Sequence, residues 1–149
     1  MGGTGVVDRF LAIFSQYIDS GFGLLSGEVA FIATTLIVID VRSDPRFSRE
    51  PAFDRIEELV TQYSDRPLII AGDFNTPLES IYLARLRQRM QNAFEARGSG
   101  LRDTWPVLLP VLSLDQVWAN DRVDWHRCEH GWSLSSDHRP VLATFSTRR

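Results

Sequence analysis

Five polar side chains in this sequence are of the types that cleave phosphoesters with the help of a metal ion. Four of them offer hard oxygen ligands that suit Mg²⁺ or Mn²⁺, and the fifth is an imidazole that titrates near neutral pH. A buried aspartate can hold such an imidazole in one tautomer and make it more basic. Together they indicate metal-assisted hydrolysis of a phosphoester. The five residues are Asp73, Asn75, Asp115, Asp137 and His138.

The first two of these residues follow an apolar run that is typical of a buried strand. Residues 67–71 are apolar throughout, and Gly72 then allows a sharp turn or a close backbone approach. Asp73 and Asn75 point to the same side if the strand continues, because side chains alternate along a strand. This stretch therefore delivers a carboxylate and a carboxamide to one place.

The residues that follow fit the start of a helix. Thr76 and Glu79 have the spacing of a capping box, and Pro77 occupies a position that tolerates proline. The free amides of such a helix start would lie beside Asp73 and Asn75, where they would suit a phosphate or an oxyanion. An ordinary polar corner between a strand and a helix is the alternative interpretation.

A strand, a helix and a second strand form the unit that must position this corner. Residues 37–41 are typical of a buried strand that ends near Asp40, and residues 51–63 have the apolar spacing of a helix. This order implies a right-handed crossover and parallel pairing with the strand that ends at Asp73. We therefore expect Asp40 and Asp73 at the same edge of one sheet.

The rest of the chain supplies further elements. Asp115 lies inside an otherwise apolar strand, where a carboxylate is rare unless it has a partner. His126, Cys128 and His130 alternate and could align as soft metal ligands, although three ligands on one strand make a poor tetrahedral site. The expected elements are a helix over residues 77–91, a loop over 98–110, and strands over 28–41 (folding back near residues 34–35), 112–119, 122–128 and 141–145.

Composition bounds the remaining possibilities. The chain has 149 residues, 44% of them hydrophobic, which suits one soluble globular domain. The net charge of −3 gives no overall basic field for nucleic acid, and the absence of lysine excludes lysine chemistry. The single cysteine, Cys128, excludes an internal disulfide. We see no signal peptide or membrane span and expect a soluble, cytoplasmic protein.

Three motifs in order resemble the endonuclease/exonuclease/phosphatase superfamily, the fold of DNase I and exonuclease III-type repair enzymes. They are Gly72-Asp73-Phe74-Asn75, Leu114-Asp115-Gln116-Val117 and Ser136-Asp137-His138-Arg139-Pro140-Val141, within a resemblance that covers about residues 28–146.

This resemblance implies a DNase I-like α/β sandwich with its site along the top of two packed sheets, and it implies roles for the five residues. By analogy, Asp73 activates or positions the attacking water, and Asn75 binds a phosphate oxygen. His138 acts as a base or stabilises the transition state while Asp115 orients it. Asp137 binds metal or phosphate, with Mg²⁺ or Mn²⁺ as the cofactor.

The sequence departs from the family pattern in two ways. Family members usually carry a catalytic histidine on the strand that corresponds to residues 37–41, where this chain has Asp40, which could bind a cation instead. The first half of the family domain, with its Asn and its principal metal-binding Glu, has no counterpart here. The chain thus resembles the C-terminal half of such a domain and a partial sandwich.

We expect an amphipathic helix over residues 6–18, within an N-terminal segment of residues 1–27 that ends in a glycine-rich connection to the domain at 28–149. In the family the last strand, here residues 141–145, pairs with strands of the first half. Its edge would be open in this chain, so two copies associate or the N-terminal helix covers it.

The leading functional interpretation is a divalent-metal-dependent phosphoesterase, whose substrate is a nucleic acid, an inositol phosphate, a sphingolipid or a small phosphodiester. A catalytically impaired half-domain that binds nucleic acid or protein is the alternative. A third interpretation is the soluble part of a membrane-associated protein.

Overall fold

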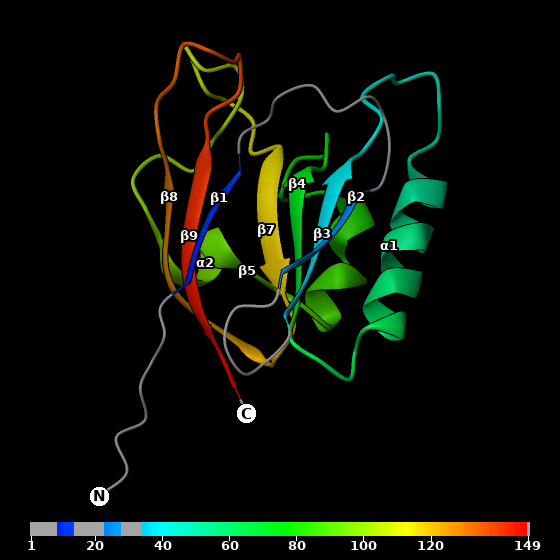
Figure 1. The fold of residues 1–149 in the computed structure, drawn as a ribbon. Coiled ribbons are helices and arrows are strands. Elements are labelled where there is room, and N and C mark those ends of the chain that lie inside the picture. Colours follow the sequence, from blue (N-terminus) through cyan, green and yellow to red (C-terminus); the bar gives the residue numbers. More distant parts are fainter. Residues whose placement is uncertain (1–8, 14–22, 28–33, 149) are drawn as a thin grey trace, which may run out of the picture.

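The computed structural model describes residues 9–13, 23–27 and 34–148. These residues form two sheets, with strand orders β1-β9-β8-β6 and β2-β3-β4-β7-β5. Figure 1 shows the sheets side by side, with α1 on the far side of the second sheet. The strands are β1 (Arg9–Ile13), β2 (Gly23–Gly27), β3 (Thr34–Asp40), β4 (Leu68–Asp73), β5 (Gln91–Asn92), β6 (Gly98–Ser99), β7 (Asp115–Ala119), β8 (Val123–His130) and β9 (Val141–Thr147), and the helices are α1 (Glu50–Gln62), α2 (Ala93–Arg97) and the short 3₁₀ helices η1 (Ile81–Leu83) and η2 (Leu86–Gln88).

The second sheet is buried on both faces. On one face Ile70 and Trp118 pack in a core with Phe53 and other residues of α1. On the other face Ile69 and Ala71 pack in a second core with residues of β8 and β9. This explains why the strand at 68–71 is apolar at every position, and it confirms a layered α/β sandwich.

The crossover from β3 through α1 to β4 is confirmed. Helix α1 buries one stripe that includes Phe53, Ile56 and Val60, as the apolar spacing predicted. β3 and β4 pair in parallel, with Asp40 opposite Asp73. β7 then pairs antiparallel with β4 and places Asp115 opposite Asp73 on its other side. Three neighbouring strands therefore each bring a carboxylate to one end of this sheet, which we call the site edge.

The predicted helix over residues 6–18 is wrong for its described part, because residues 9–13 form strand β1. β1 pairs antiparallel with β9, from Arg9 opposite Phe145 to Ile13 opposite Val141. A short apolar run fits a strand as well as a helix, and the open edge of β9 decides between them. The segment does cover that edge, but as a strand, while the rest of 6–18 lies outside the described residues.

The glycine-rich connection also contains a strand. β2 (Gly23–Gly27) pairs antiparallel with β3, with Gly27 opposite Thr34. The reversal predicted near residues 34–35 is wrong, because these residues belong to the continuous strand β3. β1 and β2 thus extend one sheet each.

The predicted helix over 77–91 is replaced by the 3₁₀ helices η1 and η2. Ser80 caps η1 with its side chain, whereas the buried Thr76 hydroxyl has no hydrogen-bond partner among the described residues. Leu83 and Leu86 are both buried and lie three residues apart, which is the repeat of a 3₁₀ helix. The helix start predicted beside Asp73 is therefore absent from the described structure.

Within the described part of the chain, no helix has the length and apolar character needed to cross a bilayer.

Candidate active site at the edge of the second sheet

The corner after β4 is built by glycine and by side-chain hydrogen bonds. Gly72 has φ +141°, and a Cβ atom there would lie 2.0 Å from the carbonyl oxygen of Ile39, so β3 and β4 approach closely only because this residue is glycine. Asn75 also has a positive φ of 44°. Its backbone amide donates to Asp73 Oδ1 at 2.7 Å, and its side-chain amide donates to the Val41 carbonyl at 2.7 Å. Asn75 thus fixes the Asp73 carboxylate and holds the end of β3.

Asp115 and His138 form the central pair of the site. His138 Nδ1 lies 2.8 Å from Asp115 Oδ2, and His138 Nε2 lies 3.9 Å from Asp73 Oδ2. Asp115 is 3% exposed and its backbone amide donates to the hydroxyl of the buried Thr104. The imidazole is therefore held from one side by a buried carboxylate and faces a second carboxylate with its other nitrogen.

Burial and neighbouring charges shift the pKa values of these groups. Burial raises the pKa of Asp73 to about 6, and the charge of Asp115 adds to this effect against the hydrogen bond from Asn75. Burial alone would lower the pKa of His138, but its hydrogen bond with Asp115 and the charges of Asp115 and Asp73 raise it overall. Asp73 and His138 therefore lose their protons at a higher pH than the same side chains would in water.

Asp40 and Asp137 lie at the margins of the pair. Asp40 is exposed at the end of β3, and its pKa is raised by partial burial and by Asp115, against the lowering effect of His138. Asp137 is also exposed and accepts a hydrogen bond from Trp105 Nε1 at 3.1 Å. The Trp105 ring centroid lies 6.4 Å from that of His138. Trp105 thus lies beside the imidazole and holds Asp137.

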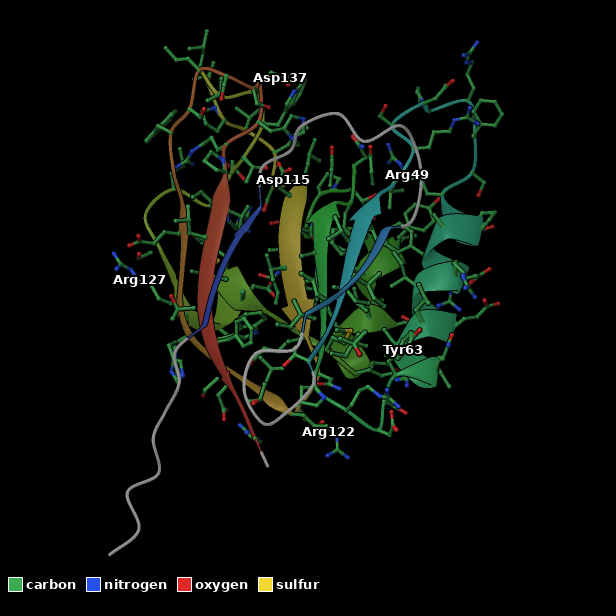
Figure 2. All side chains as sticks on the ribbon, viewed as in Figure 1. Arg49, Tyr63, Asp115, Arg122, Arg127 and Asp137 are labelled. Carbon is green, nitrogen blue, oxygen red and sulfur yellow. The ribbon has the colours of Figure 1, made fainter. Side chains whose placement is uncertain are left out.

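The structure brings three of the predicted residues into direct proximity. One ligand atom each of Asp73, Asp115 and His138 lies within 4.8 Å of the others, and this is the one group of His, Cys, Asp or Glu side chains among the described residues that could hold a metal ion. Figure 2 shows Asp115 and Asp137 at the same upper end of the molecule. Asn75 belongs to the corner beside this group. Asp40 lies opposite Asp73 on the neighbouring strand.

The alternative soft metal site on β8 is not formed. The strand is irregular between Trp125 and Arg127, which breaks the expected alternation. His126 is exposed and hydrogen-bonds to Ser146, whereas Cys128 is buried. Burial raises the pKa of the Cys128 thiol to about 12, so the thiol stays protonated.

Arg139 frames the site, although no sequence pattern predicted a role for it. This side chain is 3% exposed, and it donates to the carbonyl groups of four residues in the loops on either side. Its guanidinium carbon lies 4.3 Å from the centroid of the Trp132 ring. Its place directly after Asp137-His138 was the available signal. The four carbonyl groups belong to Leu101, Asp103, His130 and Gly131.

Comparisons with solved structures support the fold. A conserved protein of unknown function from Enterococcus faecalis V583 matches with a TM-score of 0.73 at 14% identity, over 95% of this chain and 66% of that one. A truncated TDP2 from Caenorhabditis elegans matches with a TM-score of 0.59 at 20% identity, over 93% and 65%. A mannosyl-6-phosphatase from Bacteroides thetaiotaomicron VPI-5482 matches with a TM-score of 0.57 at 16% identity, over 76% and 51%.

This chain spans about two thirds or less of the length of these structural neighbours. No curated protein matches it in sequence. The sequence model of the Endonuclease/Exonuclease/phosphatase family matches residues 3–138, which is most of the chain and includes all the site residues. The chain therefore belongs to the Endonuclease/Exonuclease/phosphatase family.

Proposed function

We propose that this chain hydrolyses phosphoester bonds with the help of a divalent metal ion. The observation that carries the proposal is the Asp115–His138 pair, whose free imidazole nitrogen faces the Asp73 carboxylate. A buried acid that fixes a histidine beside a second acid is an arrangement for moving a proton at a reacting oxygen. Family membership supports this reaction class, but it does not specify the substrate.

In this proposal each residue acts at a stated atom. Asp115 keeps the proton of His138 on Nδ1, so that Nε2 exchanges a proton with the reacting group or stabilises its developing negative charge. Asp73 orients the attacking water and accepts its proton, which its raised pKa favours. Asn75 and Asp137 bind phosphate oxygen or metal at the two sides of this pair.

The residues fit a hard divalent cation such as Mg²⁺ or Mn²⁺. Asp73 and Asp137 offer carboxylate oxygens, and Asp40 adds a third at the same edge. Burial and, to a smaller extent, the charge of Asp115 raise the pKa values of Asp73 and Asp40, and a cation bound beside them would favour their charged forms. A bound divalent ion would polarise the phosphoryl oxygen and neutralise charge in the transition state.

A panel of substrates tests the proposal. Plasmid DNA, DNA with an abasic site, bis(p-nitrophenyl) phosphate and p-nitrophenyl phosphate are incubated with Mg²⁺ or Mn²⁺, using wild type, His138→Asn and the surface control Asp121→Asn. We expect turnover of at least one ester by wild type and the control and a large loss in His138→Asn. Turnover of no ester above the His138→Asn background would contradict the proposal.

The alternative is a binding module without activity, and it is favoured by the fact that the chain spans only part of its structural neighbours. Mn²⁺ titration by calorimetry separates the two functions. Saturable Mn²⁺ binding that Asp73→Asn weakens supports the hydrolase. Absence of Mn²⁺ binding, together with tight binding of single-stranded or duplex DNA, supports the module.

Association of two copies is a further proposal. Because β1 pairs with β9, a second copy would use the outer edge of β1 or β2 rather than that of β9. Sedimentation equilibrium over a hundredfold range of protein concentration tests this proposal. A constant monomer mass would contradict it.

A further inference from the structure

Arg49 differs from the other arginine residues around α1. Arg55 pairs with Glu58 at 2.7 Å, and Arg85 pairs with Asp54 at 2.5 Å. The hydrogen bonds and ion pairs of the described residues include none made by the Arg49 side chain, and its Nε atom is buried without a partner. A buried N–H group without a hydrogen bond costs free energy, and a bound acceptor would recover that cost.

The backbone directs Arg49 toward the site edge. Arg49 precedes α1 with helical φ and ψ of −85° and −13°, so it lies one turn before Phe53 on the same face of the helix. The Phe53 ring centroid lies 6.5 Å from that of Phe74, the residue between Asp73 and Asn75. Figure 2 shows Arg49 at the upper end of β3, along the same edge of the molecule as Asp115 and Asp137.

We propose that Arg49 is an anion-binding residue that holds a phosphate oxygen of the substrate at the β3 end of the site edge. The planar guanidinium group matches the oxygens of a phosphate, and no carboxylate of the described residues forms an ion pair with it. The three acids of the site edge would repel a phosphate, so a cation at the same edge without a carboxylate partner is what a phosphoester needs. The inference rests on the proposed phosphoesterase function.

Phosphate binding tests the inference without any reaction. Inorganic phosphate is titrated into the metal-free protein by calorimetry, using wild type, Arg49→Gln and the control Arg55→Gln on the same helix. The loss of one charge-assisted hydrogen bond should weaken phosphate binding about tenfold or more in Arg49→Gln. Equal phosphate affinities in wild type and the two variants would overturn the inference.

A titration of the wild type reports on the Arg49 side chain directly. The Arg49 Nε–H signal, assigned by its loss in Arg49→Lys, should shift as inorganic phosphate saturates the protein. An unchanged signal would overturn the inference. Arg49→Met should leave Tm unchanged or higher, because it removes an unsatisfied buried group. A clear drop in Tm would instead indicate that Arg49 stabilises the fold, and it would contradict a role in binding.

Steady-state kinetics separate this inference from the proposed function. On an ester that wild type hydrolyses, Arg49→Gln should raise KM about tenfold or more and leave kcat within about twofold, since it removes a contact that the ground state and the transition state share. Unchanged KM and kcat would overturn the role of Arg49 while the phosphoesterase function stands. If no ester is hydrolysed but phosphate binding depends on Arg49, the function fails and the anion site stands.

Discussion

His130 and His138 lie eight residues apart, and their pKa values are shifted in opposite directions. The pKa of His130 falls to about 4 because burial and the Arg139 guanidinium disfavour its charged form. Its Nδ1 atom has no hydrogen-bond partner among the described residues. The centroid of its ring lies 4.7 Å from that of Phe94. Burial acts in the same direction on His138, but Asp115 and Asp73 outweigh it and raise the pKa.

Because burial lowers the pKa of both histidines, the charges of their neighbours account for the opposite directions of the two shifts. The Arg139 guanidinium donates hydrogen bonds to four carbonyl groups near His130, whereas His138 lies beside the carboxylates of Asp115 and Asp73. The first set of contacts fixes the backbone, and the second leaves His138 able to exchange protons. The contacts of Arg139 and the proposed chemistry of His138 therefore lie in adjacent parts of the molecule with opposite local charge.

The largest expected effect comes from removing the charge that distinguishes His138. Asp115→Asn keeps the shape but loses the negative charge, so we expect kcat to fall about 10²- to 10⁴-fold. The pKa of His138, followed by NMR, should fall toward or below its ordinary value, since burial is then less opposed. Asp121→Asn, on the surface, should change neither quantity. A normal kcat in Asp115→Asn would show that the pair is not catalytic.

The next largest effect is expected from replacing Arg139, the residue beside His130, and it concerns the stability of the fold. Arg139→Met removes the buried donor to four carbonyl groups, and we expect the free energy of unfolding to fall by about 3 kcal/mol or more. Arg127→Met, which breaks only the exposed pair with Glu129, should cost about 0.5 kcal/mol or less. Urea denaturation of the two variants provides the comparison, and equal costs would contradict the role given to Arg139.

A third prediction concerns acid. The pKa of His130 is about 4 in the folded protein and 6.5 ordinarily, so between these values the unfolded chain binds the extra proton. The stability contributed by neutral His130 is present above pH 6.5 and lost as pH falls to about 4, by up to about 3 kcal/mol. The stability difference between His130→Phe and wild type should therefore shift in favour of the variant on acidification. A pH-independent difference would contradict this.

The smallest effect has the opposite sign. The pKa of Asp73 is 3.8 ordinarily and about 6 in the folded protein, so the folded state holds the extra proton between these values and loses that advantage as pH rises through 6. The shift corresponds to about 3 kcal/mol, but an amide oxygen accepts the Asn75 hydrogen bond less strongly than a carboxylate does. Without metal, Asp73→Asn should therefore be more stable than wild type above pH 6, by about 1 kcal/mol. Thermal unfolding at pH 5 and pH 8 measures this. A variant that is less stable than wild type at pH 8 would contradict it.

Motif chemistry and the crossover rule were sufficient to predict much of this structure. The apolar runs and the strand-helix-strand order predicted that Asp40 and Asp73 share a sheet edge, which is confirmed by their register. The unusual acid within a strand predicted a partner for Asp115, and that partner is His138.

Features that depend on tertiary partners could not be predicted in the same way. The strand at 9–13 exists because β9 offers an open edge, a fact that no local pattern contains. The segment after Pro77 has helix-like apolar spacing, but the burial of Thr76 and Leu78 leaves only short 3₁₀ turns. The roles of Arg139 and Arg49 could not be predicted from hydrophobic periodicity. Each role depends on which carbonyl or carboxylate groups the fold brings near the guanidinium.

The pairing of β1 with β9 also bears on how the chain folds during synthesis. The two strands join residues 9–13 to residues 141–145, so their contacts are among the most distant in the sequence. Such long-range pairing slows folding, because the entropy of closing a long loop opposes it. β1 stays unpaired with β9 until the end of β9 has left the ribosome. During that interval the β3-α1-β4 unit of the second sheet can form first, because its strands are close in sequence.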